Sequence, residues 1–199
     1  YKKKLNSLGS FLDELSPEPV IFRPFHEHNG DWFWWGKSST TEQEYQELWR
    51  FTVHYLRDSL GVSNVLWAFS PDRSRMNIDS IQQDYLYAYP GDEYVDILGF
   101  DNYWDVGHPV NKLSELRQQE QFIESLTEVS KLAHSKKKPF ALTETGLEAI
   151  PDPKFWTVKL LAAIEANKWT QKLVYVQVWR NATYEPGKPD HYYAPFPGQ

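Results

Sequence analysis

Short apolar runs alternate with longer amphipathic segments along most of the chain. Consecutive apolar residues predict strands that begin near residues 20, 65, 95, 139 and 173. Between these runs, apolar residues recur every three or four positions, which predicts helices near 5–15, 41–61, 122–138 and 155–164. Thr41 and Glu44 have the spacing of a capping box, and Gly61 predicts the end of the helix that they open.

The alternation of strands and helices favours a parallel sheet with right-handed crossovers. Successive strand starts lie about 38 residues apart, a spacing that suits a (β/α)8 barrel with long loops. No glycine-rich phosphate turn follows a strand, so the sequence does not indicate a nucleotide-binding Rossmann fold. Polar or aromatic residues end each strand, and a barrel collects such residues in a ring at one face. We therefore predict part of a (β/α)8 barrel.

Aromatic residues make up an unusually large share of the 199 residues, with 9 Trp, 12 Tyr and 11 Phe. The flat face of a tryptophan ring stacks well on the C–H face of a sugar, so the composition is compatible with a carbohydrate-binding groove. A tryptophan-rich core explains the same composition, and both interpretations stay open at this stage. The hydrophobic share of 41% and the charged share of 24% are ordinary for one globular domain.

Several classes of function are disfavoured by the sequence. A net charge of -6 repels phosphate backbones, so we do not expect nucleic acid as a partner. The chain has no cysteine, which excludes thiolate metal sites and cysteine nucleophiles. No apolar run approaches the roughly 20 residues that span a bilayer. His26 and His28 lack the helical spacing of a zinc site, so we expect no metal and no cofactor.

Two glutamates stand at the ends of predicted strands. Side chains alternate along a strand, which predicts that Glu27 shares a face with Arg23 and Phe25 and that Glu144 projects from the fourth strand into the same mouth. Glycoside hydrolysis requires two carboxyl groups that flank one bond. One glutamate alone favours a structural carboxylate, whereas this pair in an aromatic-rich chain favours a glycosidase.

Four segments resemble glycoside hydrolase family 26, the β-mannanase family. Residues 23–36, RPFHEHNGDWFWWG, resemble its acid/base segment, and residues 142–146, LTETG, resemble its nucleophile segment. Residues 178–181 resemble the end of its eighth strand, and residues 191–198 resemble the loop that follows. The first motif is long and highly specific, and the segments occur in the family's order over essentially the whole chain.

The resemblance implies a role for particular residues. It makes Glu27 the general acid/base and Glu144 the nucleophile. The sugar contacts that it implies are His26, Trp32, Tyr103, Trp179 and Arg180. Separately, we expect Phe69 to line a distal subsite. We expect turn or cap roles for Asp72, Asp79 and Asp101.

The resemblance also implies a fold and an activity. Residues 1–199 would form a single incomplete catalytic domain with barrel strands four to eight, lacking the first three strands and the last helix, and with open edges. The implied enzyme is a retaining endo-β-1,4-mannanase that cleaves mannan, glucomannan or galactomannan by double displacement. Alternatives are a β-1,3-xylanase or mixed-linkage β-glucanase of the same family, or a noncatalytic carbohydrate-binding protein. A polymeric substrate implies a secreted or cell-surface protein, which we expect to be monomeric.

Overall fold

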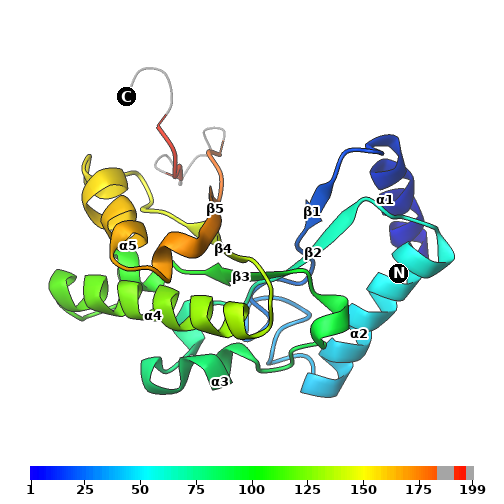
Figure 1. The fold of residues 1–199 in the computed structure, drawn as a ribbon, viewed down its shortest axis with the longest axis horizontal. Helices are drawn as coiled ribbons and strands as arrows, with labels where there is room; N and C mark the ends of the chain where they lie inside the picture. The colour runs from blue at the N-terminus through cyan, green and yellow to red at the C-terminus, as the bar shows by residue number, and fades with distance from the viewer. Residues whose placement is uncertain (183–190, 196–199) are drawn as a thin grey trace.

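The computed structural model describes residues 1–182 and 191–195. In this part of the chain, five parallel strands form one sheet whose order follows the sequence. The strands are β1 (Val20–Phe22), β2 (Val65–Phe69), β3 (Ile97–Asp101), β4 (Phe140–Thr145) and β5 (Leu173–Val178). The sheet curls so that β1 and β5 rise on opposite sides of an open concave face (Figure 1). This curled sheet confirms the prediction of a partial parallel barrel with open edges.

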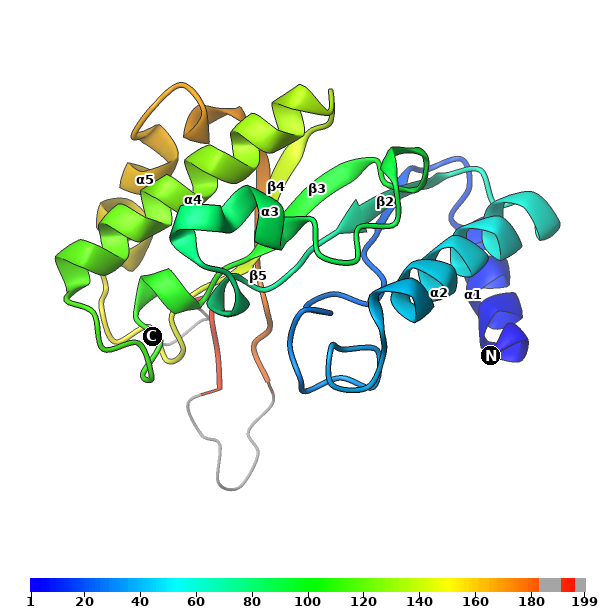
Figure 2. The same cartoon turned by 90° about the horizontal axis from the view of Figure 1, so that it is seen from below.

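Helices cover the convex side of the sheet, and α4 lies along β3 and β4 (Figure 2). The described helices are α1 (Lys2–Glu14), α2 (Glu42–His54), α3 (Ile81–Tyr85), α4 (Glu115–Ser135) and α5 (Ala162–Glu165). A π-helical turn over Tyr55–Ser59 extends α2, and another over Phe155–Leu161 precedes α5. Single 3₁₀ turns lie at Arg73–Arg75, Ile78–Ser80, Asp92–Tyr94, Trp104–Val106 and Thr170–Lys172. None of the described helices combines the length and apolar character that a membrane crossing requires.

The predicted boundaries of α2 are confirmed by its hydrogen bonds. The Thr41 hydroxyl accepts from the Glu44 amide at 3.2 Å, and the Glu44 carboxylate accepts from the Thr41 amide at 2.8 Å. This capping box satisfies amides that the first helical turn leaves unpaired. Gly61, with φ of +74°, follows the π-helical extension and ends the element in the left-handed conformation that glycine adopts without strain.

The main core lies between the sheet and the helices. α2 contributes the fully buried Trp49, and α4 contributes the fully buried Phe122 and Val129. These side chains belong to one cluster with Phe69 of β2. The concave face carries a second, smaller cluster that consists of Ala68, Ile97 and Ala141, with Tyr175 packed against it.

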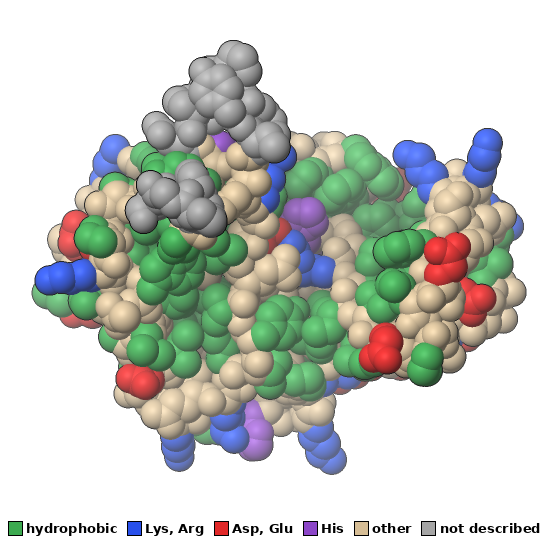
Figure 3. Space-filling model, turned by 90° about the horizontal axis from the view of Figure 1, so that it is seen from above, with side chains coloured by type: hydrophobic (Ala, Val, Ile, Leu, Met, Phe, Trp, Pro, Cys, Tyr) green, Lys and Arg blue, Asp and Glu red, His purple; other side chains and the backbone are tan. Residues whose placement is uncertain are grey.

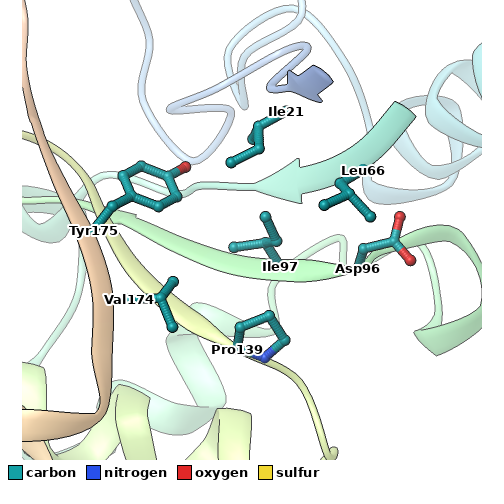
Figure 4. A pocket seen from close by; sticks show the side chains of 7 residues that line it. All are labelled: Ile21, Leu66, Asp96, Ile97, Pro139, Val174 and Tyr175. Carbon is teal, nitrogen blue, oxygen red and sulfur yellow. The ribbon is translucent and has the colours of Figure 1, made fainter. Parts of the chain in front are cut away.

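The concave face is hollowed near the amino ends of the strands. Figure 4 shows side chains of β1, β2, β3 and β5, with one residue just before β3 and one just before β4, around a hollow of about 540 Å³. The lining residues are Ile21, Leu66, Asp96, Ile97, Pro139, Val174 and Tyr175. Because most of these side chains are apolar, this end of the sheet suits packing rather than polar chemistry.

The first strand is shorter than the sequence predicts. β1 ends at Phe22, and the chain then turns, because Phe25 and Glu27 adopt left-handed conformations with φ of +49° and +53°. The expectation that Arg23, Phe25 and Glu27 share one strand face is therefore wrong. Phe25 instead packs against Trp49 at 6.3 Å between ring centres.

Candidate active site

An arginine joins two carboxylates at the carboxyl ends of the strands. Arg23, just beyond β1, donates from Nη1 to Asp101 Oδ2 at 2.8 Å and to Ser70 Oγ at 3.1 Å. Its Nη2 donates to Glu144 Oε1. The Asp101 and Glu144 side chains are 0% and 8% exposed, so these pairs lie largely out of water. Figure 3 shows basic, acidic and histidine side chains gathered at the middle of the open face.

Glu144 is held as an oriented carboxylate. It lies in β4, and its backbone carbonyl accepts from the Asn102 amide at 2.8 Å. Its second side-chain oxygen, Oε2, accepts from the Tyr103 hydroxyl at 2.9 Å. Burial and the Glu144 charge raise the pKa of Tyr103, so its hydroxyl keeps its proton and remains a donor. One cation and one hydroxyl therefore bind opposite oxygens of the same group and fix its orientation.

Glu27 has different surroundings. Its Oε2 accepts from Trp32 Nε1 at 2.7 Å, and no ion pair of this carboxyl is present among the described residues. Burial, and then the charge of Asp72, raise the pKa of Glu27 to about 7, although the Trp32 bond opposes the shift. Near neutral pH Glu27 can therefore hold a proton, as a general acid requires. Two carboxyl groups in such unlike surroundings suit an acid and a nucleophile.

The turn that carries Glu27 is fixed by backbone hydrogen bonds. The Phe25 carbonyl accepts from the Tyr45 hydroxyl at 3.0 Å, and the His26 carbonyl accepts from Trp35 Nε1 at 2.8 Å. The Glu27 amide donates to the Ser70 carbonyl at 2.8 Å. Left-handed conformations at non-glycine residues are unfavourable and persist only where the surroundings impose them. These bonds supply that constraint at the position of the candidate acid.

The two neighbouring histidines have different environments. His26 packs against Phe33 and Trp35, with ring centres 4.9 and 6.0 Å away. Burial and the nearby Arg23 charge lower the pKa of His26 to about 4, so it is neutral near pH 7. His28 is buried, stacks on the Tyr45 ring at 4.2 Å and belongs to the core. The described residues contain no group of three side chains arranged to hold a metal ion.

An exposed tryptophan follows each of these carboxyl groups along the chain. Trp32 is 44% exposed and Trp179 is 46% exposed, so both have ring surface free for a ligand. The Arg180 guanidinium lies 4.8 Å from the centre of the Trp179 ring. Tyr193 packs between Trp179 and Tyr103, at 5.7 and 5.6 Å between ring centres. Trp179 is thereby linked to the tyrosine that binds Glu144. Residues 196–198 of the motif over 191–198 lie outside the described residues.

The expected role of Phe69 is wrong. Its side chain is fully buried and contacts Trp49 and Tyr85 on the helix side of the sheet, so it cannot line a sugar subsite. Asp101 is also not a turn or cap residue, because it is the last residue of β3 and pairs with Arg23. Asp72 does cap a turn, by accepting from the Ser74 amide at 2.9 Å.

Arg23 is the main participant whose contacts the sequence does not predict. It pairs with residues 78 and 121 positions away, and a single sequence carries no local signal for such partners. The available signal was a charged residue at or near the carboxyl ends of β1, β3 and β4, since such ends meet at one face of a barrel.

Two carboxyl groups in unlike surroundings, at the carboxyl ends of curled parallel strands, are typical of barrel-type glycoside hydrolases. The chain belongs to glycosyl hydrolase family 26, whose family model matches residues 2–172.

Named relatives agree with this assignment. The chain is 38% identical over 176 residues to a mannan endo-1,4-beta-mannosidase of Bifidobacterium adolescentis. The matched region covers 82% of this chain and 16% of that protein. A mannan endo-1,4-beta-mannosidase of Bacillus subtilis is 33% identical over 71% of this chain and 35% of its own length. An endoglucanase H of Acetivibrio thermocellus is 40% identical over 42% of this chain and 9% of its own length.

Solved structures extend the similarity to the fold. The structure of GH26C from a Muricauda species is 40% identical, with a TM-score of 0.82 over 100% of this chain and 51% of that chain. A GH26 beta-mannanase from Bacteroides ovatus is 42% identical, with a TM-score of 0.79 over 98% of this chain and 52% of that chain. The chain thus spans about half the length of these solved relatives and a smaller share of the curated ones.

Proposed function

We propose that this chain is the catalytic part of a retaining endo-β-1,4-mannanase that cleaves mannan, glucomannan or galactomannan. The observation that carries the proposal is the unequal setting of Glu27 and Glu144. Glu144 accepts from a guanidinium and a hydroxyl, while Glu27 accepts from an indole and has a pKa raised to about 7. The mannan substrate is supported by family membership and by the names of the curated relatives.

The proposed reaction has two displacement steps. In the first, a Glu144 oxygen attacks the anomeric carbon while Glu27 gives its proton to the leaving glycosidic oxygen, and the C–O bond breaks. In the second, Glu27 takes a proton from water, whose oxygen attacks the same carbon and releases Glu144. Retention of configuration requires the two carboxyls to lie about 5–5.5 Å apart.

The residues around the pair have distinct proposed tasks. Arg23 and Tyr103 hold the Glu144 carboxyl group aimed at the anomeric carbon. Trp32 and Trp179 offer exposed aromatic faces for sugar rings, and Arg180 offers donors for sugar hydroxyls. His26, neutral and beside Arg23, contributes a polar ring next to the acid.

We also propose that β1 to β5 are strands four to eight of an eight-stranded barrel, with further βα units completing it in a longer protein. Three observations support this: β1 and β5 stand at the two ends of the strand order, the solved relatives are about twice as long, and apolar side chains on the concave face are exposed. Ile21, Leu66 and Val174 are 45%, 42% and 56% exposed. Open strand edges and exposed apolar surface favour aggregation.

The 199-residue chain expressed alone should therefore aggregate or form a loose globule that does not cleave mannan. Light scattering, urea unfolding and a reducing-sugar assay test this expectation. A soluble chain that unfolds cooperatively and hydrolyses mannan would show the strand numbering to be wrong. The longer protein, in contrast, should be a monomer on a sizing column and should be found outside the cell or on its surface.

Substrate profiles test the mannanase assignment itself. The longer protein should release sugars from mannan faster than from β-1,3-xylan or mixed-linkage β-glucan. The β-glucan alternative is retained because of the 40% identical segment of the endoglucanase relative. Faster cleavage of β-glucan would favour that alternative, and binding without cleavage of any polymer would favour a noncatalytic carbohydrate-binding protein.

A further inference from the structure

The loop that carries Glu27 runs beside the segment that follows β2, and the two are joined by a short ladder of hydrogen bonds. The Glu27 amide donates to the Ser70 carbonyl at 2.8 Å. Two residues further along each segment, Asn29 Nδ2 donates to the Asp72 carbonyl at 2.8 Å, and the Asp72 amide donates to Asn29 Oδ1 at 2.8 Å. Asn29 and Asp72 are 7% and 6% exposed. The asparagine side chain thus replaces the next backbone pair of the ladder.

Asp72 brings a buried carboxyl group to this ladder. Its Oδ1 accepts from the Ser74 amide at 2.9 Å and from the Ser74 hydroxyl. The neighbouring cations are engaged elsewhere in the described structure. Arg73 pairs with Asp105 at 2.9 Å, and Arg75 pairs with Asp31 at 2.7 Å. The Asp72 charge, when present, is therefore stabilised by serine donors and is not cancelled by a direct ion pair.

We propose that Asn29 and Asp72 are positioning residues for the general acid: the reciprocal bonds hold the Asp72 backbone beside the Glu27 turn, and so place the Asp72 carboxylate where its negative charge keeps the proton on Glu27. This inference rests on the proposed role of Glu27 as acid. It adds two points to that role. The Asp72 charge keeps the proton on Glu27, and the Asn29 hydrogen bonds keep Asp72 in place.

Two other charged groups near Glu27, Arg23 and Glu144, belong to the site already described. Arg23 favours ionisation of Glu27, but it is bonded to Asp101 and Glu144. The Glu144 charge and the Asp72 charge both oppose ionisation, and the Asp72 effect is the larger. Burial raises the pKa of Asp72 to about 6, which is below the value of about 7 for Glu27. Near pH 7, where Glu27 titrates, Asp72 therefore carries most of its charge.

The test compares Asp72→Asn with the wild type in the longer protein. The amide keeps the shape and the carbonyl acceptor of the aspartate but removes its charge. Asp79→Asn is the matched control, because Asp79 is an exposed aspartate in the same loop region. The Glu27 side-chain carboxyl carbon is followed by ¹³C NMR from pH 4 to pH 9 and is assigned by its absence in Glu27→Gln. The wild type, Asp72→Asn and Asp79→Asn are also assayed for kcat/KM on mannan across this pH range.

Removal of the Asp72 charge should lower the pKa of Glu27 by about one pH unit. The alkaline limb of kcat/KM should move to lower pH by the same amount, and Asp79→Asn should change neither. An unchanged Glu27 titration in folded Asp72→Asn overturns the inference.

The role of Asn29 is tested by comparing kcat/KM on two substrates. Asn29→Ala should lose about tenfold more kcat/KM on mannan than on an aryl mannoside with an activated leaving group, because only mannan needs the proton. Equal losses of kcat/KM on both substrates would show that Asn29 has a structural role and does not act through the general acid. If the wild type cleaves no polysaccharide but the Glu27 titration depends on Asp72, the proposed function fails and the charge relation stands. If it cleaves mannan but the titration does not depend on Asp72, only this inference fails.

Discussion

Arg23 should contribute more to stability than any exposed arginine of the chain, because it neutralises two buried carboxylates. Arg23→Met keeps much of the side-chain volume but removes the bonds to Asp101, Glu144 and Ser70. Removing one partner of a buried ion pair typically costs about 3–5 kcal/mol, since the remaining charge is left without compensation. We therefore expect the free energy of unfolding at pH 7 to fall by about 3–5 kcal/mol.

The cost should depend on pH with a definite sign. Burial already holds the pKa of the Asp101 carboxyl above its unfolded value, and Arg23 opposes this shift, so removing Arg23 should raise the pKa further. A group of that kind destabilises the fold above its unfolded pKa, and the penalty is relieved as the pH falls through the folded pKa. The difference between Arg23→Met and the wild type should therefore shrink from pH 8 to pH 5.

Urea unfolding of the longer protein at pH 5 and pH 8, followed by tryptophan fluorescence, measures the loss of unfolding free energy in Arg23→Met and its dependence on pH. Arg117→Met is the control, because Arg117 forms a half-exposed ion pair with Glu120 at 2.8 Å. Exposed pairs contribute about 0–1 kcal/mol, so this variant should be nearly as stable as the wild type. A cost for Arg23→Met no larger than that for Arg117→Met would refute the reasoning.

Three further predictions concern the site. Glu144→Ala should remove nearly all activity on every substrate, whereas Glu27→Ala should impair mannan far more than an activated aryl mannoside; equal losses in Glu27→Ala would exclude Glu27 as the acid. Because Glu27 must be protonated for the first step, kcat/KM should fall as the pH rises through about 7, and activity that stays constant to pH 9 would contradict the pKa assignment. Phe69→Ala should lower the free energy of unfolding by about 3–5 kcal/mol in urea titrations without a selective rise in KM; a higher KM at unchanged stability would restore a subsite role.

The strand and helix pattern was predictable because it is set by local sequence. The run Leu173–Val178 is apolar enough to identify β5, and the Thr41 and Glu44 pair is sufficient to place the start of α2. The turn after β1 was not predictable from alternation, because tertiary hydrogen bonds impose left-handed conformations on Phe25 and Glu27. Glu27 nevertheless reaches the site, since its amide binds the end of the neighbouring strand.

The contacts of the site were less predictable than its members. The motifs were enough to propose an acid, a nucleophile and their aromatic neighbours, but the bonds of Arg23 to Asp101 and Glu144 depend on which strands become neighbours. Phe69 was assigned to the wrong face because it ends a strand, although the small Ala68 beside it marks the concave side. Burial along a short strand is decided by what packs on each face, and the sequence does not give this directly.

The most direct test of the account identifies the residue that forms a covalent bond to the sugar. A 2-deoxy-2-fluoro-β-mannoside with a strongly activated leaving group slows both steps but allows the first, so the sugar should accumulate on the nucleophile. Peptide mass spectrometry of the longer protein should then show the fluoromannosyl mass on Glu144, and Glu144→Gln should show none. Labelling of Glu27 or another residue, or an active unlabelled protein whose first product is the α-anomer, would contradict the account.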